Sequence, residues 1–417
     1  WQIGNQGHSK HKNNETDYMR QIEVIVIGSG GFGSSCLYHL AQRGTRVLGL
    51  DRFPAGHDRG SSHGDTRMIR QAYLEHPDYV PLVLQAYDLW RELESESGRD
   101  LLTICGLLIG GPPDGEVVSG ARTASDLHGL DVESLTPAEA SSRFPGFRIP
   151  DGQELVFEPQ GGFLPVEDCV RTHIELACQH GAEFQSGDAV VGWQSDGKSV
   201  RVRTETAEYE AASLIITAGA WAGELLVGNS VEAIDSPGSG SASAGRMSAA
   251  RIAGSLQVRR KTLLWNPVRS EAFNLDAGGC GFLFEMPDGV FYGFPSLDGQ
   301  TLKLAEHSGG ETVTDPLHLD RSLRDTDVNP VAGFASEVMP DLDPVPIRHC
   351  VCMYTMTPDS HFLVDRHPEH ANVWFGAGFS GHGFKFTSVI GKALADLTLE
   401  GRTAVPVGFL GARRLFG

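Results

Sequence analysis

Short apolar runs separated by glycine-rich turns dominate the pattern of hydrophobic and polar positions along the chain. Ile22–Ile27 is a mostly β-branched apolar run, as expected for a strand that is buried in a parallel sheet. Residues 31–43 follow helical spacing, and Gly44 stands where a glycine commonly ends a helix. A second strand is expected over 46–50, closed by Asp51. The chain therefore opens with a strand–helix–strand unit.

Two further apolar strands are expected far along the chain, over 211–218 and 372–378. The second leads through a glycine-rich turn into a helix expected over 388–399. The stretches between are rich in turns, and GVFYGFPS and LKLAEH have patterns typical of antiparallel strands. The predicted fold class is therefore α/β (α+β overall), with one doubly wound domain assembled from distant segments and a second domain built on an antiparallel sheet.

Length, charge and cysteine content narrow the class of protein. A chain of 417 residues is long enough for two or three domains. The formal net charge of -19 argues against nucleic acid or an anionic membrane surface as a partner, because both would repel the chain. The sequence contains no run of about 18 apolar residues, the length that a bilayer-spanning helix needs. Seven cysteines without a pairing rhythm indicate a reducing compartment. We expect an intracellular monomer, cytoplasmic or peroxisomal, although the ending RRLFG is not an SKL-type address.

A glycine motif, GSGGFG (28–33), lies directly after the first predicted strand and opens the first predicted helix. Gly28 permits a tight turn, Gly30 lets the backbone approach a diphosphate, and Gly33 lets helix and strand pack closely. The N–H groups at the helix N-terminus then face the phosphates. Asp51, about 20 residues further on, can accept the ribose hydroxyls. The motif predicts a Rossmann-type dinucleotide site, and it does not by itself separate FAD from NAD.

The segment GSSHGDTRMIRQAY (60–73) strongly resembles the flavin-contacting segment of the monomeric sarcosine oxidase and N-methyltryptophan oxidase family. This family belongs to the D-amino-acid-oxidase-like flavoproteins. The similarity recurs in the family's order at FEPQGGFLPVEDCV, GAWAGELL, YGFPS with LKLAEH, CMYTMTPDSHFLVD and GFSGHGFKF, and so covers nearly everything from residue 21 onward. It implies FAD as the cofactor, with further contacts from Ser62, Thr66 and Gly381.

The resemblance and the element pattern together divide the chain. The FAD-binding domain is expected to comprise 21–103, 162–228 and 345–417, and the substrate domain 104–161 and 229–344. Residues 1–20 are polar and without periodicity, so a disordered extension is expected there. The Ser/Gly/Ala-rich segment 228–254 has no core pattern and predicts a flexible loop.

In the family, a cysteine thioether holds the flavin covalently at its 8α-methyl group. That cysteine opens the CMYT sequence, and here it is Cys352. A thiolate can add to this electrophilic position if it is close and its pKa is lowered. Cys350 lies two residues upstream and faces the same side if the stretch is a strand. Without the surrounding motifs, either cysteine would be interpreted as a small buried apolar residue.

The family binds a substrate carboxylate with the arginine of TRxxR and the lysine of GHGFK, which are here Arg70 and Lys385. Arginine offers a planar fork that suits a carboxylate, and lysine adds a point charge. The alternatives are an ion pair of Arg70 with Glu75 or Asp78, and a solvated Lys385 at the start of a helix.

Four further residues match family positions at the flavin. Lys303, in LKLAEH, matches a lysine that holds a water near the flavin and activates O2, since a fixed cation stabilises the superoxide formed first. Alternatively, a lysine in an alternating strand points to solvent. His307 matches a histidine beside the substrate, or it is a structural hydrogen-bonding residue. His63 and Arg67 match residues packed against the isoalloxazine, where Arg67 would raise the electron affinity of the ring.

Three other residues, Tyr292, Tyr354 and Thr355, match positions that contact the pocket or the ring, with aromatic core packing as the alternative. The sequence departs from the family at 304–306, where the family has glycine and tyrosine. Glu306 therefore either alters the pocket or faces solvent.

The resemblance implies an FAD-dependent oxidase of secondary amino acids, N-methyl or cyclic. A hydride equivalent passes from the carbon next to nitrogen to the flavin, the imine hydrolyses, and O2 is reduced to H2O2. A small-molecule amino acid and O2 are then the partners. Three alternatives stay open: a dehydrogenase of the same fold with another electron acceptor, an NAD-binding dehydrogenase, and a flavoprotein scaffold without turnover. Lys303 argues against the dehydrogenase with another acceptor, and the CMYT and GHGFKF segments argue against an NAD-binding dehydrogenase. A scaffold without turnover is disfavoured by the joint presence of Arg70, Lys303, Cys352 and Lys385.

Overall fold

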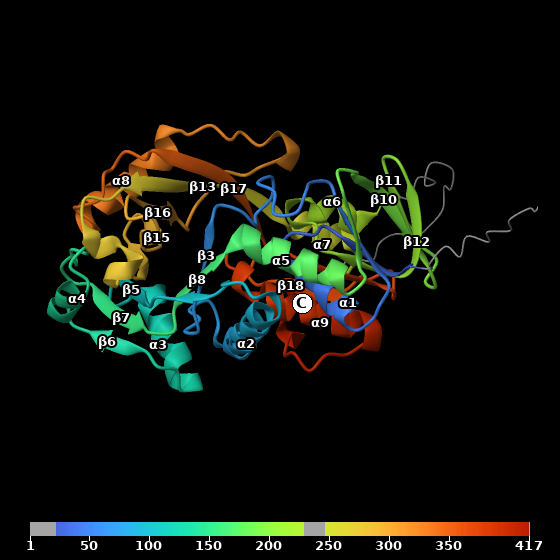
Figure 1. The fold of residues 1–417 in the computed structure, drawn as a ribbon, viewed down its shortest axis with the longest axis horizontal. Helices are drawn as coiled ribbons and strands as arrows, with labels where there is room; N and C mark the ends of the chain where they lie inside the picture. Colours follow the sequence, from blue (N-terminus) through green and yellow to red (C-terminus); the bar gives the residue numbers. More distant parts are fainter. Residues whose placement is uncertain (1–21, 229–246, 417) are drawn as a thin grey trace, which may run out of the picture.

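The computed structural model describes residues 22–228 and 247–416. Their strands form two sheets of eight strands and a small sheet of three. In Figure 1 the first large sheet lies on the right, around β12, and the second lies on the left, around β13 and β15. The expected extension at 1–20 and most of the expected loop at 228–254 lie outside the described residues.

The first sheet is the doubly wound one that the sequence predicts. Its order is β10-β11-β12-β1-β2-β9, and β19 pairs with β12 and β18. β1 pairs in parallel with β2 on one side and with β12 on the other, and β12 pairs in parallel with β19. The sheet is therefore assembled from distant segments. Its strands are β1 (Ile22–Ile27), β2 (Val47–Asp51), β9 (Glu183–Ser186), β10 (Val190–Ser195), β11 (Val200–Thr204), β12 (Glu208–Ile216), β18 (Leu363–Arg366) and β19 (Val373–Ala377).

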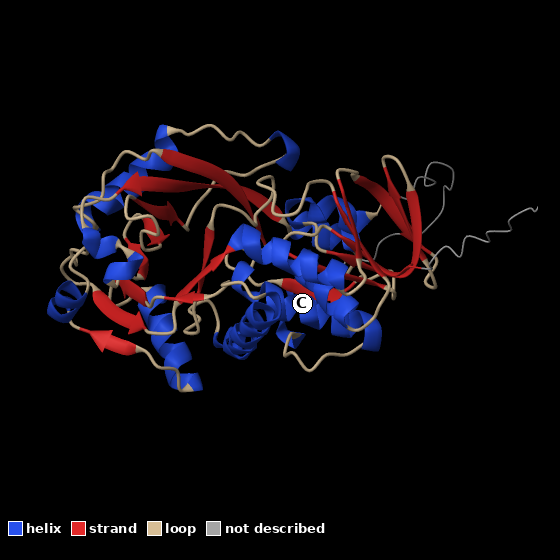
Figure 2. Ribbon diagram, viewed as in Figure 1, coloured by secondary structure: helices blue, strands red, loops and turns tan. Residues whose placement is uncertain are grey.

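Helix α1 packs between α5 and α9 as well as against the strands that flank it. Almost all of its residues are buried, which explains why it carries no charged side chain. In the view of Figure 2, helices gather in the middle of the molecule, between the strands at its two ends. The helices of this half are α1 (Gly31–Gln42), α2 (Val80–Ser97), α5 (Val166–Gln179), α6 (Ala222–Val227), α7 (Ala249–Ser255) and α9 (Thr387–Glu400).

The second sheet has the order β17-β13-β16-β15-β14-β5-β7-β6 and is antiparallel except for the pair β14 and β5. Helix α8 packs on it, with the Phe334 ring stacked 4.8 Å from the Phe291 ring. Its strands are β5 (Leu107–Gly111), β6 (Glu133–Leu135), β7 (Glu154–Glu158), β13 (Gln257–Pro267), β14 (Gly281–Met286), β15 (Gly289–Gly293), β16 (Thr301–Glu306) and β17 (Arg348–Met356).

The remaining helices are α3 (Glu116–His128), α4 (Pro137–Arg143) and α8 (Asp325–Val338). The small sheet, of order β3-β8-β4, lies between the two large ones in Figure 1 and comprises β3 (Thr66–Ile69), β4 (Thr103–Ile104) and β8 (Gly162–Pro165). Within 22–228 and 247–416, no helix is long and apolar enough to cross a bilayer.

Two features differ from the sequence-based prediction. β17 pairs along its length with β13, with Lys261 opposite Cys352, so residues 348–356 belong to the second sheet, although the sequence-based division places 345–417 with the FAD-binding domain. A strand's local pattern does not say which sheet it joins, and the other domain boundaries stay a prediction. The C-terminal part of the expected loop forms α7, which is capped by the Ser248 hydroxyl. Ala249 and Ile252 are buried there at helical spacing.

Candidate active site

A cavity of about 410 Å³ lies between the two large sheets. Its lining combines the carboxyl ends of β1 and β2 with side chains of β14, β15 and β17 and with the turn at 379–385. Open α/β sheets bind ligands at the carboxyl ends of their strands, and the second sheet supplies the opposite wall. The cavity therefore lies between the predicted dinucleotide-binding edge of the first sheet and the wall that the second sheet supplies.

The turn after β1 requires its glycines. Gly28 has a φ of +85°, and a Cβ there would lie 2.7 Å from the Ala218 Cα. A Cβ on Gly33 would lie 1.8 Å from the Gly28 carbonyl oxygen. Gly30 lines the cavity, and the Ser62 hydroxyl, also in the lining, accepts the Gly31 N–H at 3.2 Å. The turn thus brings the N-terminus of α1 against the cavity, as the motif predicts.

Asp51 ends β2 and lines the cavity. One carboxylate oxygen accepts the Ser29 N–H at 2.7 Å and the other accepts the Phe53 N–H at 2.9 Å. Burial raises the pKa of the carboxyl group. Asp51 therefore fixes the glycine turn and the chain after β2 as well as facing the predicted ribose position.

The loop at 60–67 brings His63 and Arg67 together beside β17. The Arg67 guanidinium lines the cavity and donates to the carbonyl oxygens of Ser61 at 2.8 Å and Thr66 at 2.9 Å. The His63 Nε2 bonds the Gly60 carbonyl at 3.1 Å, and burial lowers the pKa of His63 to about 3. Arg67 therefore presents a fixed positive charge, whereas His63 is neutral.

The two cysteines of β17 lie against this loop. The Cys352 thiol is fully buried and lies 3.9 Å from an Arg67 nitrogen. The Cys350 thiol lies 3.8 Å from the His63 Nδ1, and burial raises its pKa to about 12. Neither thiol is among the described residues that line the cavity.

Lys303, on β16, is buried beneath the same loop. Its ammonium donates to the carbonyl oxygens of Gly64 and Thr66, at 2.6 Å each, and to the Thr66 hydroxyl at 3.1 Å. These three acceptors match the three N–H donors of an ammonium group. Burial, followed by the charge of Arg67, lowers the pKa of Lys303. The structure therefore places Lys303 behind residues 64–66 and not in the cavity lining, and it does not point to solvent.

Arg70 and Lys385 are both buried and both line the cavity, and we call this pair the clamp. Arg70 Nη2 lies 2.7 Å from each carboxylate oxygen of Glu75, so one ion pair considered as an alternative is present. The Lys385 ammonium donates to the His382 carbonyl at 2.9 Å. Burial, then the charge of Arg70, lowers the pKa of Lys385 to about 7.

Aromatic side chains and His307 form another part of the cavity lining. The Tyr354 hydroxyl lies 3.4 Å from the His307 Nδ1, and the ring of Tyr292 lies 6.2 Å from the imidazole. All three residues line the cavity, as do Thr355 and Gly381. Burial lowers the pKa of His307 to about 3, so the imidazole is neutral. Glu306 is not in this lining, and its carboxylate accepts the Ser308 hydroxyl at 2.8 Å.

Three buried polar residues next to the clamp were missed by sequence reasoning. Glu158 accepts the N–H groups of Gln71 and Ala72, and burial raises its pKa to about 7. Tyr73 and His382 are hydrogen-bonded to each other. A signal was present, because Glu158 ends the apolar run LVF of β7 as a buried charged residue, and the other two lie three residues from a clamp residue.

Comparison with known proteins adds to this geometry. A family model described as FAD dependent oxidoreductase, DAO, matches residues 23–397. The chain belongs to this family. The oxidoreductase is 37% identical over 404 residues to the monomeric sarcosine oxidase of Streptomyces avermitilis. The alignment covers 94% of this chain and 97% of the relative. It is 33% identical over 378 residues to the N-methyl-L-tryptophan oxidase of Yersinia pestis, over 89% and 94% of the two chains.

Solved structures share the fold of the oxidoreductase. NikD, an unusual amino acid oxidase essential for nikkomycin biosynthesis, matches in its open form with a TM-score of 0.77 at 24% identity, over 93% of this chain and 96% of NikD. The L-proline dehydrogenase from P. horikoshii matches with a TM-score of 0.77 at 20% identity, over 94% and 97% of the two chains. At these identities the likeness establishes the fold alone.

Unpaired polar atoms in the cavity suit FAD, the cofactor of this family. Three buried polar atoms, Arg52 Nη1, Trp221 Nε1 and Thr355 Oγ1, have no hydrogen-bond partner within residues 22–228 and 247–416, and all three residues line the cavity. A buried polar atom without a partner is costly, so each atom calls for a ligand group to bond. FAD offers polar groups on its diphosphate, ribose and isoalloxazine. The residues of the oxidoreductase therefore fit FAD.

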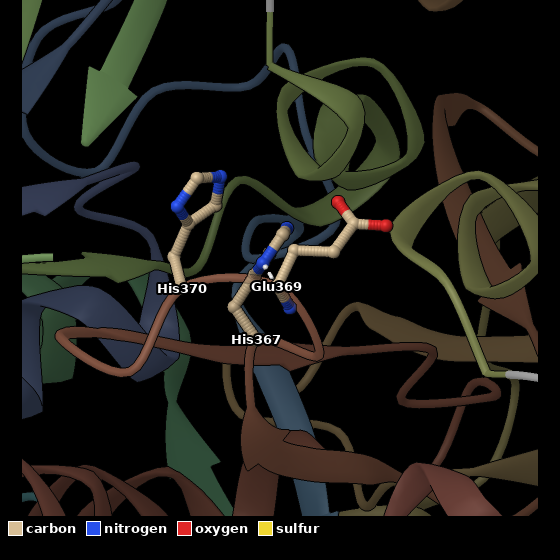
Figure 3. Close-up of side chains that lie close together, drawn as sticks. All are labelled: His367, Glu369 and His370. Carbon is tan, nitrogen blue, oxygen red and sulfur yellow. Dashed lines mark hydrogen bonds between the residues drawn. The ribbon is translucent and has the colours of Figure 1, made fainter. Parts of the chain in front are cut away.

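A second cluster of potential ligands lies on the turn after β18. Ligand atoms of His367, Glu369 and His370 lie within 4.8 Å of one another (Figure 3). Both ring nitrogens of His367 are already bonded, Nε2 to the Leu226 carbonyl at 3.0 Å and Nδ1 to the Glu369 N–H at 3.2 Å. The Glu369 carboxylate accepts the Ala249 N–H at 3.4 Å. These bonds fasten the turn to α6 and α7, which is a structural role.

Proposed function

We propose that this chain is an FAD-dependent oxidase of secondary amino acids, N-methyl or cyclic, that reduces O2 to H2O2. The observation that carries the proposal is the clamp of two buried cations, Arg70 and Lys385, at the same cavity as the dinucleotide-binding turn. Such a pair suits a carboxylate, which arginine binds with a planar fork and lysine with a point charge. Relatives named monomeric sarcosine oxidase and N-methyl-L-tryptophan oxidase support the same class of substrate.

The proposed reaction removes two electrons and two protons from a CH–NH unit and leaves an imine, which water hydrolyses. O2 takes up two electrons and two protons as H2O2. When bound, FAD supplies the acceptor for the substrate electrons and passes them to O2. The clamp would orient the carboxylate, and the neutral His307 can accept a hydrogen bond from the amine without adding positive charge. Arg67 would hold positive charge at the flavin.

A peroxide-coupled screen tests this function. Sarcosine, N-methyltryptophan, pipecolate and proline are supplied to the holoenzyme, with the corresponding primary amino acids and methyl esters as controls. We expect peroxide from at least one secondary amino acid and little from its ester. Flavin that no secondary amino acid bleaches under anaerobic conditions would contradict the proposal.

A dehydrogenase that passes electrons to another acceptor is the second candidate, because the fold is shared with an L-proline dehydrogenase. The two candidates differ in their products. An oxidase gives one peroxide per imine in air, whereas a dehydrogenase reduces an added dye or quinone and gives little peroxide. We also propose that the protein is a monomer. An intracellular location, cytoplasmic or peroxisomal, stays a prediction from the sequence.

Covalent attachment of FAD through Cys352 is part of the proposal. Cys352 is favoured over Cys350 because it matches the family cysteine that opens CMYT, and its buried thiol lies 3.9 Å from the Arg67 guanidinium. We expect acid-precipitated wild-type protein to stay yellow and Cys352→Ser to release its FAD to the supernatant or to purify without it. Cys350→Ser is the matched control and should keep the flavin in the pellet. Flavin lost wholly from the wild-type pellet would rule out the linkage.

The affinity for a carboxylate should depend on pH through Lys385. Burial lowers the pKa of this lysine to about 7, so its positive charge is present below pH 7 and lost as the pH rises. A bound carboxylate favours the charged form. We therefore expect the Kd of benzoate, followed by the flavin spectrum, to be flat below pH 7 and to rise about tenfold per pH unit above it. Lys385→Met should bind benzoate more weakly and should show a smaller change of Kd around pH 7, where the remaining change comes from Glu158, whose pKa burial raises to about 7. The Kd of benzamide should change little with pH in either protein.

A further inference from the structure

One aromatic ring lies close to both cations of the clamp. Tyr73 is fully buried, and its ring is near Arg70 and near Lys385. The Arg70 guanidinium carbon is 4.5 Å from the ring centroid, and the Lys385 ammonium is 5.3 Å from it. An aromatic face attracts a cation through its quadrupole, and the attraction is stronger where water is excluded. One ring therefore attracts both of these mutually repelling charges.

The orientation of this ring is set by His382. The His382 Nε2 lies 2.9 Å from the Ser360 carbonyl oxygen, which can only accept, so this nitrogen carries the proton. The Nδ1 is then an acceptor, and the Tyr73 hydroxyl donates to it. Burial lowers the pKa of His382 to about 4, which keeps this arrangement at neutral pH.

His382 also contacts the clamp directly. Its carbonyl oxygen accepts the Lys385 ammonium at 2.9 Å and lies 3.3 Å from the Tyr73 hydroxyl. The ring of Tyr73 also packs against the ring of Tyr79, at 4.9 Å, and against the ring of Phe386, at 5.0 Å. The ring, the hydroxyl bond and the lysine contact therefore form one connected unit behind the two cations.

We propose that Tyr73 and His382 are positioning residues for the substrate carboxylate. The Tyr73 ring attracts and so positions both Arg70 and Lys385, and the His382 imidazole holds the ring in place through the tyrosine hydroxyl. The inference rests on the proposed function only in that the clamp binds a carboxylate. Neither side chain has to touch the substrate for this role.

The test compares benzoate with its neutral isostere benzamide on the holoenzyme. Tyr73→Leu removes the ring, and we expect the Kd of benzoate to rise roughly 5- to 30-fold, with little change for benzamide. Tyr73→Phe keeps the ring and loses only the hydroxyl bond, so a rise of at most about fivefold is expected. His382→Gln should resemble Tyr73→Phe. If Tyr73→Leu does not retain flavin, the same comparison is made with Tyr73→Phe and His382→Gln. An unchanged ratio of the benzoate Kd to the benzamide Kd in both variants would then overturn the inference.

A second readout separates positioning from a general effect on packing. Without the ring face, the charged form of Lys385 is less stable, so the pH at which benzoate affinity begins to fall should move below that of the wild type in Tyr73→Leu and stay unchanged in Tyr73→Phe. The other groups that influence this lysine are Arg67, Arg70, Glu75 and Glu158, and all four are kept in these variants.

The outcomes are distinct. In Tyr73→Leu, two results together would overturn the positioning role and leave the proposed function standing. These are an unchanged pH at which benzoate affinity begins to fall and an unchanged ratio of benzoate to benzamide affinity. A wild-type enzyme that does not prefer benzoate to benzamide would overturn both.

Discussion

Lys303→Met is expected to slow the reoxidation of the reduced flavin by O2 about 100- to 1,000-fold, which corresponds to about 2.7–4 kcal/mol. Transfer of the first electron to O2 creates a negative charge, which a fixed cation stabilises. The Lys303 ammonium is held by three acceptors from residues 64–66, beside the loop that carries Arg67. Methionine keeps the apolar length of the side chain and removes the charge. Stopped-flow mixing of the reduced enzyme with O2 measures the effect.

Anaerobic reduction by substrate should change much less, because that half-reaction needs no added cation. Lys261→Met is a matched control, since Lys261 is also buried in the second sheet and its ammonium donates to the Ser308 carbonyl at 2.5 Å. It should leave reoxidation near the wild-type rate. Equal defects in both half-reactions of Lys303→Met would mean that the lysine mainly supports the 64–66 loop. Reoxidation at the wild-type rate would remove Lys303 from the mechanism and favour the dehydrogenase.

Arg70→Ala is expected to raise the Kd of benzoate roughly 30- to 1,000-fold, because loss of a hydrogen-bonded charge partner of a bound carboxylate costs about 2–4 kcal/mol. Arg70 is buried at the cavity, so solvent does not screen the contact. Its ion pair with Glu75 sharpens the expectation, because the variant also leaves an unpaired carboxylate that repels the ligand. Titration of the flavin spectrum measures both effects together.

Two controls isolate the clamp. Arg70→Lys keeps the charge and loses the planar fork, so it should fall between wild type and Arg70→Ala. Arg99→Ala removes an exposed arginine–glutamate pair, with Glu175, and should leave the Kd unchanged. Benzamide should bind Arg70→Ala about as well as it binds wild type. Equal losses for benzoate and benzamide would show that Arg70 is structural.

The elements that the sequence predicted well are those whose pattern is local. The turn at 28–33 depends on steric limits at Gly28 and Gly33, which belong to the motif itself. The sheet that β17 joins could not be inferred this way, since strand pattern is local and the choice of partner strand is tertiary. The helix at 249–255 was hidden because a composition-based interpretation averaged it with its neighbours, although Ser248 and the apolar spacing of Ala249 and Ile252 were a signal.

The candidate site divides in the same way. Motifs predicted residues that the fold brings to one cavity, including Arg70, Lys385 and His307. They did not reveal that Lys303 would lie behind the lining. The bond between Tyr73 and His382 joins positions 309 residues apart, and no spacing rule reaches that far. Both residues lie in recognised segments, but their roles depend on which nitrogen of one imidazole carries a proton.

The membership of β17 in the second sheet has a mechanical consequence. The dinucleotide turn belongs to the first sheet, whereas Cys352 belongs to the second. With the proposed thioether, FAD would link the two halves. Its diphosphate would be bound by the first sheet, and its ring would be attached covalently to the second. A tether of this kind keeps the ring at a high effective concentration at its site and limits how far the halves can separate. Cofactor incorporation would then act as the last step of assembly, after which the two halves unfold as one cooperative unit.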